Sequence, residues 1–298
     1  MIIDSHCHFM TEEYAKSSPF YSHEWYDFEM REVKKFQVSD DHKEILTYPL
    51  EAIMNKFTID TIPEKIISFN DEVAKISSRY NVYATAAIYP LVESKYYLME
   101  MERAINELGL CGFSLASSYD GLYLDDEKFW PLFEKASELN KPIFIHPVTS
   151  NPIGSDRLKD YRLMPMLGFV FDTTVCLTRL VLSGVLNRFN NVKLVFSHTG
   201  GAFAYLLPRI ITLGNAFKLD IDSNNIHKTL KNVYFDTCTD DLGVLEFAIK
   251  TFGADKILFG SDFPAVDNIQ RMVDAIDRIN ISNEEKKMIL GSSVQGIL

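Results

Sequence analysis

Short apolar runs rich in β-branched and aromatic residues alternate with longer amphipathic segments along most of the chain. In the longer segments the apolar residues recur at intervals of three and four, the period of a helix with one buried face. The pattern predicts strands at 2–5, 58–62, 82–88, 112–116, 143–146, 194–197, 233–236 and 257–260. It predicts helices between them at 71–80, 95–108, 127–139, 173–189, 202–213, 242–252 and 267–279. This alternation indicates parallel strands joined by right-handed crossovers.

Eight strand–helix units predict an α/β fold, the (β/α)8 TIM barrel. That fold typically takes about 250 residues, so the 298 residues here leave room for insertions after strands 1 and 5, at 9–50 and 148–171. A doubly wound open sheet is the competing arrangement. The barrel is favoured because polar residues follow predicted strands one, five, six and eight, and only a closed ring brings those strand ends to a common centre. With no internal repeat or low-complexity tract, residues 1–298 are expected to form a single domain.

The composition narrows the class of protein. Hydrophobic residues make up 47% of the chain, enough for a large core, and the formal net charge of −11 argues against a nucleic-acid partner, which would need clustered Lys and Arg. An acid and a histidine near the start, and the lack of any run of about 18 apolar residues, predict a cytoplasmic protein without membrane contact. The scattered cysteines are expected to be reduced thiols: Cys7, Cys111, Cys176 and Cys238.

Histidines and one aspartate stand where predicted strands end. His6 and His8 follow strand 1, His146 ends strand 5, His198 follows strand 6 and Asp262 follows strand 8. A buried imidazole costs free energy unless its nitrogens find partners, so this recurrence needs a shared reason, and a divalent cation supplies one. Residues two apart in a strand face the same side, so His6 and His8 can reach one ion. With His146 and Asp262 they form a ligand set that suits Zn²⁺ and is acceptable to Mn²⁺, Fe²⁺ or Co²⁺.

Three further residues near these strand ends have possible roles. His198 could be a fifth ligand, an orienting hydrogen-bond partner or a proton carrier, since imidazole titrates near neutral pH. Asp236, which follows strand 7, is a candidate to orient a ligating histidine. Cys7 lies between the first two histidines, and the alternation of side chains along a strand predicts that it points away from the ion.

Several motifs occur in a fixed order from the first strand nearly to the end of the chain. They are Asp4-Ser-His6-Cys-His8, Phe144-Ile-His146-Pro147, Phe171-Asp-Thr-Thr174, Leu186-Asn-Arg188-Phe189, Ser197-His198-Thr-Gly-Gly201-Ala-Phe203, Arg209-Ile210 and Phe259-Gly-Ser-Asp262-Phe-Pro264. In this combination the chain resembles the amidohydrolase-2 family of metal-dependent TIM-barrel hydrolases and decarboxylases. The resemblance implies that His6, His8, His146 and Asp262 bind the metal. It also implies that His198 acts as acid/base. Asp262 is the second candidate to carry the proton and is therefore a candidate catalytic residue as well as a ligand.

Two details refine the resemblance. Binuclear members of the wider superfamily carry a lysine on strand four that bridges two metals, whereas 111–116 contains no lysine. This predicts one divalent metal ion per chain, with zinc as the first choice and manganese as the alternative. The opening motif is H-x-H, as in the aminocarboxymuconate-semialdehyde decarboxylase group, and not the E-x-H of the γ-resorcylate group.

The leading hypothesis is therefore a mononuclear metal-dependent decarboxylase, a carbon–carbon lyase that removes CO2 from an aromatic or unsaturated carboxylic acid without a redox cofactor. One rival is a metal-dependent hydrolase of a lactone, ester or amide. A second is a catalytically degenerate metal-binding scaffold.

The expected partner is a small-molecule carboxylate substrate. Arg157, Arg31 and Arg162 are candidates to bind it, because a guanidinium presents a planar fork to a carboxylate, and Phe171 is a candidate for the pocket wall. By the same resemblance we expect a homo-oligomer, such as a dimer, with the aromatic first insertion as the contact surface.

Overall fold

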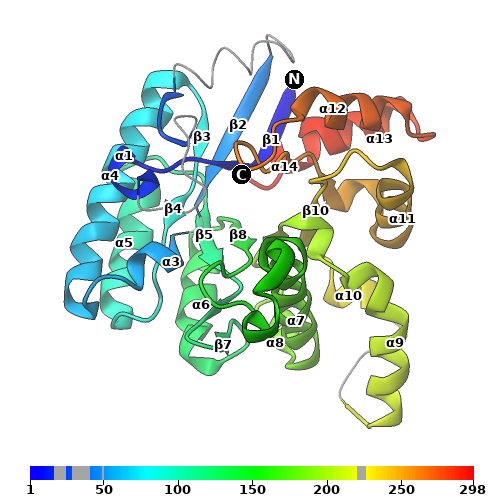
Figure 1. Cartoon of the computed structure of the whole chain (residues 1–298), viewed down its shortest axis with the longest axis horizontal. Coiled ribbons are helices and arrows are strands. Elements are labelled where there is room, and N and C mark those ends of the chain that lie inside the picture. Colours follow the sequence, from blue (N-terminus) through cyan, green and yellow to red (C-terminus); the bar gives the residue numbers. More distant parts are fainter. Residues whose placement is uncertain (17–24, 29–40, 49, 220–225) are drawn as a thin grey trace.

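The computed structural model describes residues 1–16, 25–28, 41–48, 50–219 and 226–298. Its centre is a ring of short parallel strands surrounded by helices (Figure 1). The strands of the ring are β1 (Ile2–His8), β2 (His42–Thr47), β3 (Tyr83–Ala84), β4 (Ala86–Ala87), β5 (Phe113–Ala116), β8 (Ile143–His146), β9 (Leu194–Phe196), β10 (Val233–Asp236) and β11 (Ile257–Leu258). The expected (β/α)8 barrel is confirmed.

Backbone hydrogen bonds close the ring at its two discontinuities. Strands β3 and β4 are halves of one barrel strand interrupted at Thr85, whose N–H donates to the carbonyl of Leu46 at 3.1 Å. On the other side β1 meets the extension of β11, where the Ser5 N–H donates to the Phe259 carbonyl at 2.8 Å. The carboxyl ends of all the barrel strands therefore face one mouth.

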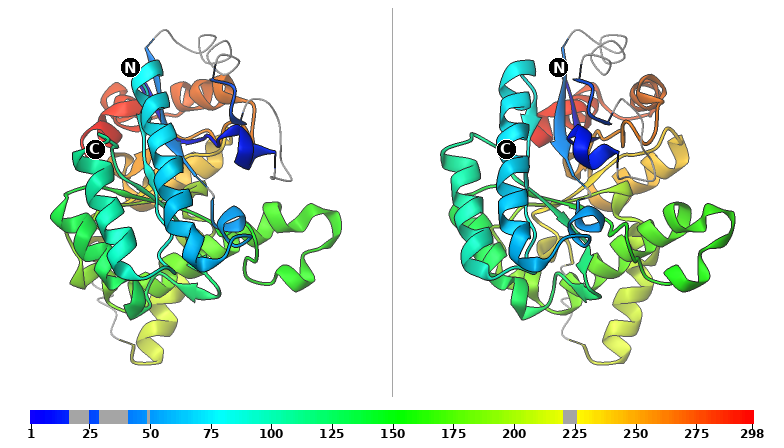
Figure 2. Two further views of the ribbon diagram at one scale, coloured as in Figure 1. Left: turned by 90° about the vertical axis from the view of Figure 1, so that its left-hand side faces the viewer. Right: turned by 60° about the vertical axis from the view of Figure 1, so that its left-hand side comes forward.

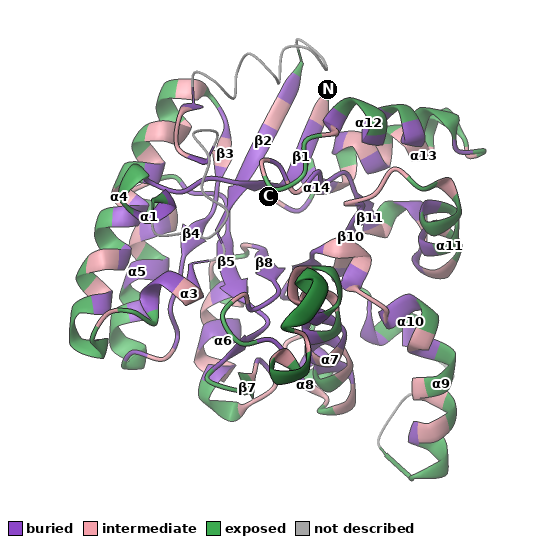
Figure 3. Cartoon of the chain, viewed as in Figure 1, coloured by how far each residue is buried: buried purple, intermediate pink, exposed green. Residues whose placement is uncertain are grey.

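The helices cover the outside of the barrel (Figures 1 and 2). They are α1 (Glu12–Ala15), α3 (Glu51–Met54), α4 (Ile62–Tyr80), α5 (Ser94–Asn106), α6 (Trp130–Glu138), α7 (Phe169–Leu182), α8 (Val185–Arg188), α9 (Phe203–Ala216), α10 (Ile226–Thr229), α11 (Leu242–Phe252), α12 (Ile269–Arg278), α13 (Asn283–Lys287) and α14 (Ser293–Gln295). Their inner faces are buried against the strands, while their outer faces are exposed (Figure 3). The short antiparallel hairpin β6 (Ser118–Tyr119) and β7 (Leu122–Tyr123) follows β5.

The interior of the barrel is apolar toward the amino ends of the strands. Side chains from five barrel strands form this buried cluster: Ile3, Ile45, Phe144, Val195 and Leu258. Val294 of α14 packs against them. Polar side chains are thus displaced to the opposite end of the barrel, where the loops carry function in this fold.

The second barrel strand differs from the sequence prediction. Residues 59–61 form a 3-10 turn, and α4 begins directly after it with Pro63 in its first turn, where a missing N–H costs nothing. The strand at this place in the ring is β2, from within the predicted first insertion, so that insertion ends at residue 41 and not at 50. β2 begins with polar residues, so the apolar pattern of the sequence did not indicate a strand there. His42 and Glu44 are nonetheless buried in the structure.

One helical segment among the described residues, Asp160–Leu182, has the length and mean hydropathy, 1.4, of a membrane-spanning helix. Core helices of barrels meet the same criterion. In this segment α7 buries Cys176, Leu177 and Leu180 against the barrel.

Candidate metal centre

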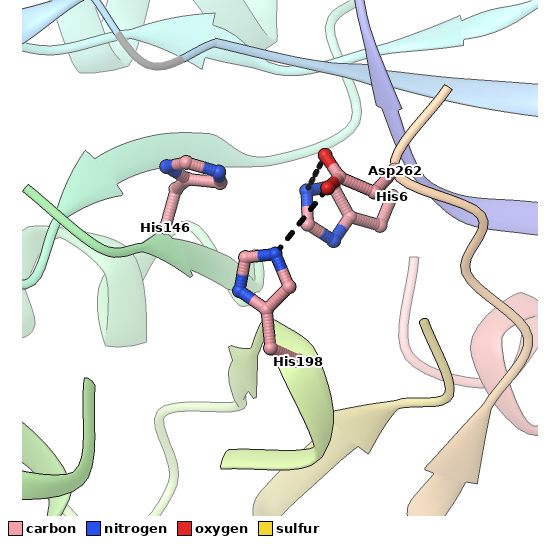
Figure 4. A group of neighbouring side chains, drawn as sticks. All are labelled: His6, His146, His198 and Asp262. Atoms are coloured by element: carbon pink, nitrogen blue, oxygen red, sulfur yellow. Dashed lines mark hydrogen bonds and ion pairs between the residues drawn. The ribbon is translucent and has the colours of Figure 1, made fainter. Parts of the chain in front are cut away.

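Of the residues that the strand ends predicted, His6, His146, His198 and Asp262 come together at the barrel mouth (Figure 4). The Nε2 atoms of His6 and His8 lie 3.1 Å apart, and they lie 3.4 and 3.0 Å from Oδ1 of Asp262. The His146 ring is 4.8 Å from the His8 ring, centre to centre. The candidate ligand atoms of His6, His146, His198 and Asp262 all lie within 4.8 Å of one another. One ion can therefore reach these four side chains, and His8 contacts His6 and Asp262 among them.

An irregularity in β1 aims its two histidines into the barrel. The register with β2 shifts between Asp4 and Cys7. Before the shift Ile3 belongs to the cluster inside the barrel, and after it Cys7 belongs to the core between strands and helices. Because side chains alternate along a strand, this shift directs His6 and His8 inward and Cys7 outward, as the sequence predicted for Cys7.

In His6, His8 and His146 the ring nitrogen Nδ1 has a partner of its own. Nδ1 of His6 lies 2.6 Å from Oδ2 of Asp236, Nδ1 of His146 lies 2.9 Å from the Pro147 carbonyl, and Nδ1 of His8 lies 3.3 Å from the Thr47 carbonyl. With Nδ1 as the donor in each case, the Nε2 lone pairs converge on the centre. This is the arrangement in which protein histidines bind a metal, so the donor set fits a divalent cation.

The pKa shifts of these side chains also agree with the binding of a divalent cation. Burial lowers the pKa of His8 and lowers the pKa of His146 well below its usual value, so both rings are neutral, as ligands must be. Burial also opposes charge on His6, but Asp236 and Asp262 outweigh it and raise the pKa of His6 to about 9. Burial opposes ionisation of Asp262, yet His6, His198 and His8 hold the pKa of Asp262 well below its usual value. The carboxylates therefore favour positive charge at the centre, which a divalent ion would supply.

His198 occupies a strained turn beside this centre. Its φ is 55°, in the left-handed region, and its Nε2 lies 3.5 Å from Oδ2 of Asp262, whose own φ is 63°. Within the described residues the Nδ1 atom of His198 is buried without a hydrogen-bond partner. Strained backbone of this kind is characteristic of functional sites. The ring nitrogens of His198 can either bind a metal or carry a proton that is transferred.

Two neighbours of the centre were not identified from the sequence. The Trp25 ring stacks on His8 with ring centres 5.6 Å apart and planes inclined by 9°. The Cys238 sulfur lies 3.1 Å from Nδ1 of His6. Neither residue has a sequence signal that points to the site, because each reaches it through a loop whose path depends on the tertiary fold.

The proposed substrate contacts have different placements. Arg157 lies on an exposed 3-10 turn, with 88% of its side chain exposed and its Nε 3.8 Å from Asp156. Phe171 lies in the first turn of α7 and is half-exposed. Arg31 lies outside the described residues. Arg162 is exposed in the same insertion as Arg157.

Comparison with known proteins gives a family match and several relatives. The sequence model of the amidohydrolase family matches residues 3–292. The 2-amino-3-carboxymuconate-6-semialdehyde decarboxylase of Dictyostelium discoideum is 29% identical over 199 residues, which are 65% of this chain and 55% of that protein. The gamma-resorcylate decarboxylase of Polaromonas sp. JS666 is 28% identical over 243 residues, 76% of this chain and 72% of that protein.

Solved structures share the fold along its whole length. The dihydroxybenzoic acid decarboxylase of Polaromonas sp. JS666, with bound manganese and the inhibitor 2-nitroresorcinol, superimposes with a TM-score of 0.84 at 25% identity, covering 99% of this chain and 96% of that one. The 5-carboxyvanillate decarboxylase of Sphingomonas paucimobilis gives a TM-score of 0.88 at 20% identity, covering 99% and 98%. The second likeness shows the fold alone.

Proposed function

Because this chain belongs to the amidohydrolase family, whose sequence model matches residues 3–292, we propose that it is a metal-dependent enzyme that decarboxylates an aromatic or unsaturated carboxylic acid without a redox cofactor. The single observation that carries the proposal is the convergence of His6, His8, His146 and Asp262 beside His198, whose buried Nδ1 has no partner among the described residues. The relatives named above as decarboxylases support this chemistry over other reactions of the family.

The proposed ligands of a single divalent ion are His6, His8, His146 and Asp262. Three imidazoles and a carboxylate suit zinc, which we propose as the first choice, and the manganese bound in the Polaromonas structure makes that ion the alternative. When bound, the ion polarises the substrate carboxylate or a neighbouring oxygen and acts as an electron sink.

In the proposed reaction, protein side chains supply the proton that replaces CO2. Loss of CO2 breaks a carbon–carbon bond and leaves its electron pair on the substrate carbon, which must take up a proton. His198 is the proposed donor of that proton, since its Nε2 lies 3.5 Å from Oδ2 of Asp262 within the cluster. Asp262 holds that ring in position and is the second catalytic residue of the proposal. Trp25 stacks on the His8 ring and so supports one of the proposed ligands.

Arg157, Arg31 and Phe171 are the proposed substrate contacts. A guanidinium would pair with a carboxylate of the substrate, and the cation at the centre would add to the attraction in an otherwise acidic protein. The protein is further proposed to be cytoplasmic and to form a homo-oligomer. The first insertion, where the sequence predicts the contact surface, lies mostly outside the described residues.

Hydrolysis of a lactone, ester or amide is the second candidate function, because the same ligand set lowers the pKa of a bound water to about 7 in hydrolases. The deciding experiment incubates the metal-loaded protein with hydroxybenzoates, carboxymuconate-like acids and lactones. It follows CO2 release and ring opening in parallel, with His6→Ala as the metal-deficient control. We expect CO2 from at least one acid. Lactone turnover with no CO2 from any acid would overturn the decarboxylase proposal, and inactivity toward every compound by metal-loaded protein would favour the scaffold.

A further inference from the structure

A second group of candidate metal ligands lies behind His6, on the side of its ring away from Asp262. The group consists of Nδ1 of His6, a carboxylate oxygen of Asp236 and the sulfur of Cys238, which all lie within 4.8 Å of one another. Nδ1 lies 2.6 Å from the Asp236 oxygen and 3.1 Å from the sulfur. Figure 4 shows one nitrogen of the His6 ring in contact with Asp262 and the other on the far side of the ring. The two nitrogens of one imidazole therefore face two different sets of ligands.

Gly260 allows this close approach. A Cβ at Gly260 would lie 2.9 Å from Cβ of His6 and 2.7 Å from Cβ of Asp236, so a larger residue would displace one of these two side chains. The Gly260 carbonyl also accepts a hydrogen bond from the Cys238 N–H at 2.9 Å. Cys238 has a φ of 39°, which is strained for a residue with a side chain, and this hydrogen bond helps to hold it. The backbone thus keeps the thiol beside the His6 ring.

The thiol of Cys238 is accessible in a way that the other thiols are not. The other three cysteines of the chain are buried, whereas Cys238 is partly exposed. Desolvation and the carboxylates of Asp236 and Asp262 raise the pKa of Cys238 well above its usual value. The negative charge that keeps this thiol protonated is one that a cation would offset, and a thiolate is the ligand that soft and borderline ions prefer.

We propose that His6, Asp236 and Cys238 form a second cation site, which takes Cd²⁺ or an excess of Zn²⁺ while the first ion stays in place. The imidazole of His6 then bridges two ions, through Nε2 on one side and Nδ1 on the other. Each ligand must be deprotonated, so the S–H proton of Cys238 and the Nδ1–H proton of His6 are released to solvent as the two bonds to the second ion form. One divalent ion thus replaces two protons, and the charge balances.

The geometry is close to what such an ion requires. With bonds of about 2.0 Å to nitrogen and oxygen and about 2.3 Å to sulfur, the ligand atoms of a tetrahedral zinc ion stand about 3.3–3.5 Å apart. The separations of 3.1 Å and 2.6 Å at Nδ1 of His6 need to widen by less than about 1 Å. The second ion is the more weakly bound one, because it must also break the hydrogen bond between His6 and Asp236. Protein purified without added metal is therefore expected to hold the first ion alone.

The second ion acts on the first through the shared ring. It takes Nδ1 of His6 away from Asp236, the carboxylate that orients this ring. An excess of a thiol-binding metal should therefore shift the position and the charge of a ligand of the first ion. The site shares His6 with the proposed catalytic centre and rests on the proposed function for that ligand, but its tests are spectra and metal counts that need no substrate.

Cd²⁺ is the probe, because a bond between Cd²⁺ and a thiolate has its own ultraviolet absorption band. Protein loaded with about one Co²⁺ per chain is titrated with Cd²⁺ while this band and the visible Co²⁺ spectrum are recorded. We expect the band to grow until about one Cd²⁺ is bound per chain, and the Co²⁺ spectrum to shift without loss of Co²⁺, since His6 is a ligand of both ions. Cys238→Ser should abolish the band and keep the Co²⁺. Cys111→Ser, at a buried cysteine that belongs to neither ligand group, is the matched control and should keep both.

Metal counts give a second measurement that does not depend on one variant. In excess Zn²⁺ the wild type should bind about two ions per chain, and Cys238→Ala, like Cys238→Ser, about one. Replacement of Co²⁺ by Cd²⁺ without a thiolate band overturns the second site and leaves the first intact. A band that persists in both Cys238 variants, or that Cys111→Ser abolishes, also overturns it. Protein that binds no Co²⁺ contradicts the proposed catalytic centre, and the Cd²⁺ band in the wild type and the Cys238 variants then decides the second site alone.

Discussion

Oδ2 of Asp236 lies 2.6 Å from Nδ1 of His6, and both side chains are buried. This contact fixes the His6 ring with its Nε2 atom directed at the metal centre. Asp236 comes from β10 and His6 from β1, on strands distant in sequence that the closed barrel brings together. We take Asp236 to be a positioning residue, which acts on the metal through His6.

Replacing Asp236 by Asn should weaken metal binding by about 10- to 100-fold, the usual effect of losing a carboxylate behind a ligating histidine. Isothermal titration with Zn²⁺ and Mn²⁺ measures it. Asp255→Asn, at an exposed aspartate, is the matched control and should bind metal as the wild type does. Equal affinity in both variants would show that the contact only supports the fold.

Protein purified without added metal should contain about one divalent ion per chain, because no lysine is present in the strand-four segment to bridge a second ion. His6→Ala and His146→Ala should lose the ion and still fold, since an open catalytic site contributes less to folding than a closed structural one. Elemental analysis with circular dichroism tests both statements. Two tightly held ions per chain would contradict the mononuclear site.

His198→Ala should retain metal and lose about 10² to 10⁴ in turnover, the range for a positioned acid or base. The measurement combines elemental analysis with the CO2 assay, once a substrate is found. If the metal is lost together with activity, His198 is a ligand and not a proton carrier.

Gly201→Ala should destabilise the turn that carries His198. A Cβ at Gly201, where φ is 67°, would lie 2.2 Å from the Val170 carbonyl oxygen and 2.4 Å from Oγ1 of Thr174. The expected loss of unfolding free energy is about 1–3 kcal/mol from overpacking, in addition to the cost of a left-handed alanine. Gly184→Ala shares that second cost, since φ is 77° there with no atom within 4 Å, and serves as the control. If Gly201→Ala and Gly184→Ala lose the same unfolding free energy in chemical denaturation, the neighbours of Gly201 have moved away from the added Cβ.

Glu51 should make stability fall as pH rises. Its carboxyl is buried, and Oε1 accepts hydrogen bonds from Oγ1 of Thr149 at 2.6 Å and from the Ser150 N–H at 3.3 Å. Oε2 is buried without a partner among the described residues, and burial raises the pKa of Glu51 above its usual value of 4.5. The folded state then binds more protons than the unfolded state as pH climbs from that usual value, so stability is lost through this window.

Glu51→Gln removes this titration. Its unfolding free energy relative to the wild type should therefore rise between pH 5 and pH 8 in denaturant titrations. Glu102→Gln, at an exposed glutamate, should track the wild type at both pH values. A constant difference for Glu51→Gln across this range would show that Glu51 is charged in the folded protein throughout.

The sequence by itself determined the barrel and the residues at its mouth. Apolar periodicity predicts most of the strands correctly. Barrel strands are buried on both faces, by the helices outside and by the barrel interior, so their sequences are short apolar runs. The predicted strands 143–146 and 233–236 coincide with β8 and β10. His6, His8, His146 and Asp262 could be named because each stands at a strand end, and parallel strands in a closed ring share one mouth. The second strand was misplaced, since β2 opens with polar residues and its burial comes from tertiary neighbours.

Only the tertiary structure decided how those residues are held and what surrounds them. The register shift that turns His6 and His8 inward depends on the pairing of β1 with β2, which no local pattern encodes. The stacking of Trp25 on His8 and the exposed position of Arg157 depend on loop paths. Loops are shaped by what they pack against, not by their own periodicity.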